Sequence, residues 1–168
     1  MSLAITHEVS AEEFRKAAGQ FATGITVVSV QHDGIIRGMT ANSFTSVSLE
    51  PPLVLVSVDT RRSIHSALIA APRYVISVLA AHQQHISARF ASSKTDMRTA
   101  YDDIPHQLTR DGLPLIDGAL AHFVCRGYAT YPGGDHSLFV GYVEEVQVTA
   151  GAPLLYVAGA YRRVHADA

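Results

Sequence analysis

The segment GMTANSFTSVSLEPPLVLVSVD, residues 38–59, concentrates side chains that could hold a ligand. It is rich in Ser and Thr, and residues 40–43 (TANS) supply three short hydrogen-bonding side chains at the start of an expected strand. Ser57 and Asp59 end the next expected strand, where loops commonly carry binding groups. Small hydroxyl side chains add little to a hydrophobic core, so the pattern indicates either a ligand site or a solvent-facing sheet surface.

Short hydroxyl and amide groups suit a ligand that joins a flat ring to a polyhydroxyl tail and a phosphate, as in flavin mononucleotide. Ser63 could cap the helix that we expect next, and the N-terminal amides of that helix would suit a phosphate. Arg89 could supply a fixed positive charge for the same phosphate. These residues alone do not separate a flavin from another phosphorylated ligand.

Other site motifs are missing from the sequence. It contains no G-x-G-x-x-G, no G-x-x-x-x-G-K-[ST] and no G-x-S-x-G. His82 and His85 are three residues apart on an expected helix and could face one ion. The sequence places no third ligand beside them, so a solvated helix face is the favoured interpretation and we expect no metal site.

Composition indicates one globular domain over residues 1–168, because hydrophobic residues make up 48% and charged residues only 17%. So apolar a chain is expected to bury some surface against another molecule, often a second copy of itself. The formal net charge is −2, and Arg and Lys are scattered, so we expect no nucleic-acid partner.

The single cysteine, Cys125, excludes a disulfide within the chain and favours a cytoplasmic protein. It lies in the apolar run AHFVCRGYA, which favours a buried, unreactive thiol over a reactive one. We expect neither a signal peptide in MSLAITHEVSAEEFRK nor a membrane-spanning segment, since no apolar stretch reaches the roughly 18 residues that a bilayer requires.

Hydrophobic periodicity predicts the elements that must position these residues. Ser10 and Glu13 form a capping-box pattern for a helix over residues 10–24, with Phe14 and Phe21 at helical spacing. Residues 25–40 read as two strands joined at Asp33-Gly34. Strands over 43–49 and 53–59 follow, separated by a Pro-Pro break.

The rest of the chain alternates between helices and further strands. Helices are expected over 61–72 and 82–92, with a strand over 73–80 between them and a polar, loop-rich region over 92–120 after them. Strands resume over 119–131, and after a loop PGGDHS they continue over 138–151 and 153–164. About seven strands, most able to pair antiparallel, and two or three helices predict a barrel or sandwich with helices packed outside.

The chain resembles the small flavin reductases that serve as the reductase component of two-component flavin-dependent monooxygenases. The resemblance runs from about Phe14 to Arg162. The residues that carry it are FRKAAGQFATGITVVSV, GMTANSFTSVSLEPPLVLVSVD, RYVISVLAAHQQHISARFA, GDHSLFVGYVEEV and PLLYVAGAYRR. The second and fourth of these stretches are specific when taken together.

This resemblance implies a mainly β fold with peripheral helices, the antiparallel FMN-binding split β-barrel, working as a homodimer with the flavin near the dimer interface. It assigns the ring and ribityl chain to Thr40, Ala41, Asn42 and Ser43, the ring edge to Ser57, Val58 and Asp59, and the phosphate end to Ser63, Arg89 and Phe90. His136 of the Gly-Asp-His stretch is implied at the nicotinamide, as catalytic residue, with Tyr161 nearby. The hydroxyls would then be the polar wall of a flavin slot.

The implied reaction is NAD(P)H + flavin + H⁺ → NAD(P)⁺ + reduced flavin, with the reduced FMN or FAD supplied to a separate monooxygenase. One alternative is a carrier that holds its flavin tightly, and another is a reductase whose fixed flavin passes electrons to a different acceptor. Arg61 and Arg62 depart from the expected small polar residues. They are either solvated, which we favour, or they contact the pyrophosphate of FAD. The sequence therefore does not decide whether the flavin is FMN or FAD. It also does not decide whether the reductant is NADH or NADPH.

Overall fold

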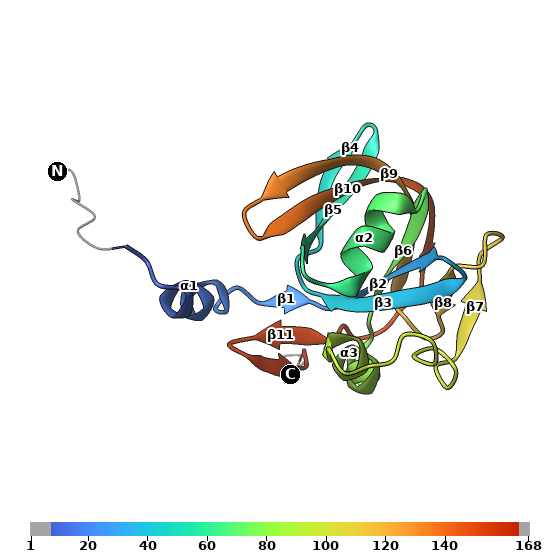
Figure 1. Ribbon diagram of the computed structural model, residues 1–168. Helices are drawn as coiled ribbons and strands as arrows, with labels where there is room; N and C mark the ends of the chain where they lie inside the picture. The colour runs from blue at the N-terminus through green and yellow to red at the C-terminus, as the bar shows by residue number, and fades with distance from the viewer. Residues whose placement is uncertain (1–7, 165–168) are drawn as a thin grey trace.

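Seven strands form one antiparallel sheet that curls around a helix (Figure 1). The computed structural model describes residues 8–164. The strand order is β3-β2-β6-β9-β10-β5-β4. These strands are β2 (Thr26–His32), β3 (Ile35–Ala41), β4 (Thr45–Leu49), β5 (Pro52–Asp59), β6 (Arg73–Val78), β9 (Ala121–Gly133) and β10 (His136–Val148). This architecture confirms the expected mainly β, antiparallel split barrel.

Smaller elements surround this sheet. A three-stranded sheet contains β1 (Thr23–Gly24), β11 (Leu155–Val157) and β12 (Ala160–Arg162), and a two-stranded sheet contains β7 (His106–Leu108) and β8 (Pro114–Ile116). The helices are α1 (Ala11–Ala18), α2 (Ser63–Ala70), the 3₁₀ turn η1 (Ala81–Gln83) and α3 (Gln84–Ala91). Figure 1 shows α3 below the barrel beside β11, and α1 standing apart at the end of β1.

The predicted hairpin at Asp33-Gly34 is confirmed. Asp33 has φ 53° and Gly34 has φ 72°, and the two residues join β2 to β3. Positive φ at both central residues matches the right-handed twist of the flanking strands, and Asp-Gly tolerates it better than most pairs. The hairpin thus fixes the register that carries Thr40 opposite Val27.

Two hydrophobic clusters make up most of the core. The first fills the barrel and includes Ile64, Ala67 and Leu68 of α2, so this helix packs inside the curled sheet and not outside it as the sequence predicts for its helices. The second joins α3 to the sheet through Ile86 and Phe90, which confirms that the two residues share a buried face. Helix α2 differs from expectation because its apolar residues are not confined to one stripe. A helix packed on the outside of a sheet needs only one such stripe, and a more widely apolar helix is buried.

The N-terminal helix is shorter than predicted. Its capping box between Ser10 and Glu13 is present, but α1 ends at Ala18 and the chain turns at Gly19. The Gly19 carbonyl accepts a hydrogen bond from Ala158 N, and β1 then pairs with β11. Pairing with a strand from the other end of the chain therefore ends the helix before Gly24, which local periodicity cannot foresee.

The region over 92–120 is more ordered than the sequence predicts. It contains the β7–β8 hairpin, and Ala100, Tyr101 and Ile104 are buried in the second cluster. The predicted loop PGGDHS is shorter than expected, because β9 runs to Gly133 and β10 begins at His136. Its turn has only two residues, and Gly134 adopts φ 70°, a conformation that favours glycine.

Cys125 is buried on β9, as expected, and burial raises the pKa of its thiol to about 12. Such a thiol is almost entirely protonated at neutral pH, which makes it a poor nucleophile. Among residues 8–164, no helix combines the length and the hydropathy that crossing a bilayer requires. The same residues include no group of three or more His, Cys, Asp or Glu side chains arranged to hold a metal ion.

Substitution of Gly38 by alanine is expected to destabilise the contact between β3 and α3. A Cβ atom at Gly38 would lie 2.6 Å from ring atoms of Phe90 and from the Tyr101 hydroxyl, both buried side chains. Overpacking of this kind costs about 1–3 kcal/mol. We expect Gly38→Ala to lower the free energy of unfolding in urea by that amount. Gly24→Ala is the control, because a Cβ there meets nothing within 4 Å; equal losses in both variants would contradict the prediction.

Candidate functional site

The hydroxyl of Ser43 fastens the hydroxyl-rich segment to β5. Its Oγ donates to the Ser57 carbonyl at 2.9 Å and accepts from the Ser57 N–H at 3.0 Å. The ladder between β4 and β5 begins at Thr45 and Leu55, so beyond this pair the serine side chain takes the place of a strand partner. The Ser43 side chain therefore satisfies the backbone N–H and carbonyl of Ser57 at this edge of β5, where another strand would otherwise have to do so.

A small cavity of about 150 Å³ is lined in part by Thr40 and Asn42, which precede Ser43 in the same segment. Thr40 Oγ1 donates to the Ser87 carbonyl at 2.7 Å, and the Ser87 Oγ and the Tyr161 hydroxyl share a hydrogen bond of 2.9 Å. The rings of Tyr156 and Tyr161 pack edge-to-face with centroids 5.5 Å apart. The cavity thus combines hydroxyls with an aromatic wall, and its lining is Ile25, Thr40, Asn42, Ser87, Ala91, Tyr156 and Tyr161.

A charged corner forms where β5 ends and β10 begins. His136 is the direct partner of Asp59 across the antiparallel ladder. The His136 Nδ1 lies 2.6 Å from Asp135 Oδ1, and since a carboxylate can only accept, Nδ1 carries the hydrogen. Asp59 is bonded in turn to Arg61, whose Nη2 lies 2.7 Å from Oδ2. The guanidinium of Arg61 holds the pKa of the Asp59 carboxyl far below its usual range.

Three of the residues assigned to the flavin have buried side chains. Val58 is 0% exposed, and Ala41 and Phe90 are likewise part of the hydrophobic clusters. The ring of Phe90 packs against that of Tyr101 with centroids 4.8 Å apart. A ligand could meet these three residues only through their backbone groups. The assignments of Ala41 to the ring and ribityl chain, of Val58 to the ring edge and of Phe90 to the phosphate end therefore stay predictions about the main chain.

The two residues predicted to attract a phosphate differ in their surroundings. Arg89 donates to the carbonyl of Ala100 and forms a two-pronged ion pair with Asp103, and this pairing lowers the pKa of the Asp103 carboxyl to about 2. Ser63 is exposed and is the first residue of α2, while Arg62 occupies the N-cap position and makes no side-chain capping bond. The prediction that Ser63 caps this helix is therefore wrong by one position.

Sequence reasoning missed the partners that complete the site. Ser87 and Tyr156 line the cavity, Asp135 orients His136, and Asp103 pairs with Arg89. The pair Tyr156 and Tyr161 had a detectable signal, because the two tyrosines flank an Ala-Gly turn and are direct ladder partners. The other contacts join residues that are far apart in the sequence or depend on a side-chain rotamer, so no local pattern reports them.

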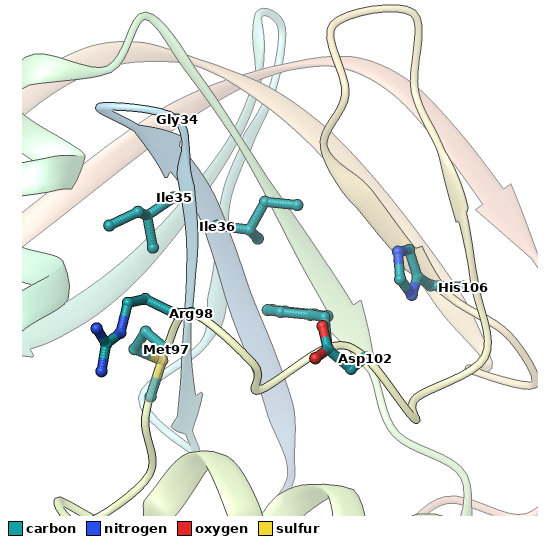
Figure 2. Close-up of a pocket in the computed structure, with 8 residues that line it drawn as sticks. Gly34, Ile35, Ile36, Met97, Arg98, Asp102 and His106 are labelled. Carbon is teal, nitrogen blue, oxygen red and sulfur yellow. The ribbon is translucent and has the colours of Figure 1, made fainter.

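A separate hollow of about 420 Å³ lies between the start of β3 and the segment 97–106. Figure 2 shows Ile35 and Ile36 along one side of it, with Met97, Arg98, Asp102 and His106 around it. Its eight lining residues, all in the described part of the chain, include none of those predicted to form the site. The hydroxyl cavity and the charged corner therefore remain the candidate site, although this hollow is larger.

The side chains present fit a flavin in their chemistry. Asn42 is exposed at the cavity, where its amide could meet ring-edge or ribityl atoms. Thr40 lies on β3, and Ser57 lies on β5, where its backbone is bonded to the Ser43 hydroxyl. The charged corner adjoins the end of β5, because Asp59, two residues beyond Ser57, is the strand partner of His136 on β10. Segment 40–59 thus carries hydroxyl and amide groups near its start and, as its last residue, the strand partner of His136.

Comparison with known proteins identifies the family of the chain. The model of the family described as "Flavin reductase like domain" matches residues 18–165. An NADH-dependent flavin reductase of Rhodococcus sp is 41% identical over 158 residues, covering 92% of this chain and 87% of the relative. The reductase component of 4-hydroxyphenylacetate 3-monooxygenase from Thermus thermophilus is 39% identical, covering 91% and 96%.

Solved structures give the same result. The NADH:FAD oxidoreductase of Streptomyces globisporus C-1027, solved with NAD and FAD fragments, superposes with a TM-score of 0.88 at 40% identity, covering 97% of this chain and 99% of the other. The flavin reductase component of a bacterial two-component tryptophan halogenase gives 0.88 at 38% identity, covering 94% and 100%. The fold that carries the hydroxyl cavity and the charged corner is thus shared with these reductases. The chain belongs to the flavin reductase like domain family.

Proposed function

We propose that this protein is an NAD(P)H-dependent flavin reductase, which reduces FMN or FAD by hydride transfer and supplies the reduced flavin to a separate monooxygenase. The observation that carries the proposal is the joining of a hydroxyl-lined cavity to a carboxylate-oriented histidine by one segment, residues 40–59, with the histidine paired to its last residue. The relatives include reductase components of two-component monooxygenases, which supports a separate oxygenase as partner.

The flavin would be held by the residues around Ser43. Side chains of Thr40, Asn42 and Ser57 would bond the ribityl chain and ring edge, and backbone groups of Ala41 and Val58 would complete that edge. Ser63 and Arg89 would lie toward the phosphate. A bound flavin accepts hydride at N5 from the nicotinamide C4, so the protein needs no nucleophile and its task is to stack and align the two rings.

His136 would hold the dinucleotide. With Nδ1–H donated to Asp135, the Nε2 atom is the ring nitrogen left for the nicotinamide amide or the linking phosphates. Tyr161, whose hydroxyl is bonded to Ser87, would contact the same ligand from the cavity wall. These groups orient the hydride donor and do not themselves carry the hydride.

A homodimer is part of the proposal. Within residues 8–164, α1 has no buried residue, and Phe14 and Phe21 on and after it are 66% and 78% exposed. Figure 1 shows α1 and β1, which together form an N-terminal arm, extending away from the barrel of the same chain. Two exposed phenylalanines on one short arm favour burial against a second copy, and β1 connects the arm to β11, which carries Tyr156 of the cavity. A cytoplasmic location, supported by the single buried cysteine, completes the proposal.

NADH oxidation by the purified protein should depend on added flavin. We expect the steady-state rate to rise with FMN or FAD and to saturate, because the flavin is exchanged as a substrate. The same assay with NADPH identifies the preferred donor. A protein that is purified with bound flavin, and whose rate ignores added flavin, would instead be a carrier or a reductase with a fixed flavin and another acceptor.

Removal of the His136 imidazole should weaken the use of NADH. We expect His136→Ala to lower kcat/KM for NADH at least tenfold, or about 1.4 kcal/mol of transition-state binding, with a smaller effect on the KM for flavin. His32→Ala is the matched control, because His32 also pairs with the next residue, Asp33, at a hairpin turn. A change below about twofold in His136→Ala would show that the assigned role is wrong.

The exposed arm predicts which residues hold the dimer together. Analytical ultracentrifugation of the parent protein should give a dimer, and Phe14→Ser combined with Phe21→Ser should shift it toward monomer, because burial of a phenylalanine is worth about 1.5–3 kcal/mol. Leu108→Ser, at an exposed apolar position on β7, is the control and should leave the dimer intact. A monomeric parent, or a double variant that stays dimeric, would refute this assignment.

A further inference from the structure

Arg61 bonds the Asp59 carboxylate through both its side chain and its backbone, and the proposed reaction gives Arg61 no role. Its Nε donates to Asp59 Oδ1 at 3.0 Å, its Nη2 to Oδ2 at 2.7 Å, and its backbone N–H to Oδ1 at 2.9 Å. One residue therefore engages both oxygens of the carboxylate. The Arg61 side chain is 79% exposed, but the Asp59 side chain is only 20% exposed. The carboxylate is therefore the member of the pair that the protein shields from solvent.

The backbone fixes this ion pair beside His136. In an antiparallel sheet, directly opposed residues place their Cβ atoms about 4.5–5.5 Å apart on the same face. Asp59 and His136 are such a pair. Thr60 closes the corner, because its N–H and its hydroxyl both donate to the Asp135 carbonyl, at 3.0 and 3.1 Å. The main chain thus places the two side chains next to each other on one face of the sheet.

Two carboxylates consequently face one imidazole. Asp135 binds Nδ1, and Asp59 approaches from the opposite strand. From β9, the facing residue is Gly133, which brings no charge. From α2, the nearest titratable group is His65, which is bonded to Ser137. An unpaired carboxylate at the position of Asp59 would compete with Asp135 for the ring and would favour its doubly protonated form.

We propose that Arg61 is a positioning residue: it occupies the Asp59 carboxylate, so that His136 donates from Nδ1 to Asp135 and keeps Nε2 for the dinucleotide. This inference rests on the proposed role of His136. The planar fork of arginine suits the task, because it satisfies two oxygens at once while a lysine would act as a point charge. Arg61 therefore acts through Asp59 and need not touch the pyrophosphate of FAD, which was the alternative that the sequence left open.

The neighbouring Arg62 provides a matched control. It has the same charge and is exposed, but it lies at the N-cap of α2, and within the described residues it forms no ion pair with Asp59 or Asp135. Loss of Arg62 removes one positive charge from the same turn and leaves the fork on Asp59 in place. A difference between the two substitutions thus separates the specific contact from general charge.

The test follows the titration of His136 by ¹H–¹³C NMR in the full-length protein, with its signal identified by its absence in His136→Gln. We expect Arg61→Gln to raise the titration midpoint by about 0.5–1 pH unit and Arg62→Gln by less than about 0.2. Arg61→Gln combined with Asp59→Asn should return the midpoint to near the parent value. Equal shifts in the two arginine variants, no shift in Arg61→Gln, or no return in the double variant would overturn the proposal.

Kinetics on the same variants separate this inference from the proposed function. The pH profile of kcat/KM for NADH should move in Arg61→Gln by the amount seen in the NMR titration, and Arg61→Lys should restore it in part. If the NMR midpoint moves while kcat/KM is unaffected in both Arg61→Gln and His136→Ala, Arg61 positions the imidazole but the histidine does not serve the dinucleotide. In that case the assigned role of His136 fails and the coupling through Asp59 stands.

Discussion

The ladder between β5 and β10 is the constraint on which the candidate site depends. It pairs seven residues in unbroken register, from His136 with Asp59 to Tyr142 with Leu53. Side chains alternate along a strand, so a slip of one residue would move Val56 and Val58 out of the core and turn Asp59 away from His136. The same hydrophobic burial that stabilises the barrel therefore places the Asp59 and His136 side chains on one face.

Several Ser and Thr hydroxyl groups in and near the candidate site are hydrogen-bonded within the protein and help to hold its elements together. Thr26 Oγ1 donates to the Ala41 carbonyl at 2.8 Å, Thr40 bonds to Ser87, and Ser43 bonds to both backbone groups of Ser57. Thr26 and Ala41 are ladder partners of β2 and β3, so their bond reinforces existing pairing. The bonds of Thr40 and Ser43 instead join elements that have no ladder at that point, so side chains hold the fold together there in place of paired strands. Part of the hydroxyl wall is thus committed to the protein, and the lone pairs that remain are those a ribityl chain can use.

The sequence predicted what is local and missed what is long-range. The Asp33-Gly34 hairpin and the Ser10–Glu13 capping box follow from a few adjacent residues, and periodicity located Ile86 and Phe90 on a buried face. The C-terminal end of α1 was not predicted, because pairing of β1 with the distant strand β11 decides it. The short β7–β8 hairpin was also missed, in a segment that the sequence assigned to loops. At the site, the hydrophobic pattern placed Thr40, Ser57 and Asp59 on strands, and the roles that the resemblance gives them stay predictions. The pairing of Arg89 with Asp103 was not predicted, because tertiary packing brings the two residues together.

Arg61 and Arg89 are both already bonded to aspartates, Arg61 to Asp59 and Arg89 to Asp103. A phosphate that approaches Arg89 must share the guanidinium with a carboxylate, and it gains less than it would from an unpaired arginine because part of the positive charge is already compensated. The ion pair nevertheless holds Arg89 in place when no ligand is bound, so little side-chain entropy is lost on binding. Fast, weak and repeatable binding is what a flavin needs if it must leave in reduced form for another protein. The paired arginines therefore favour a flavin that is exchanged over one that is permanently held.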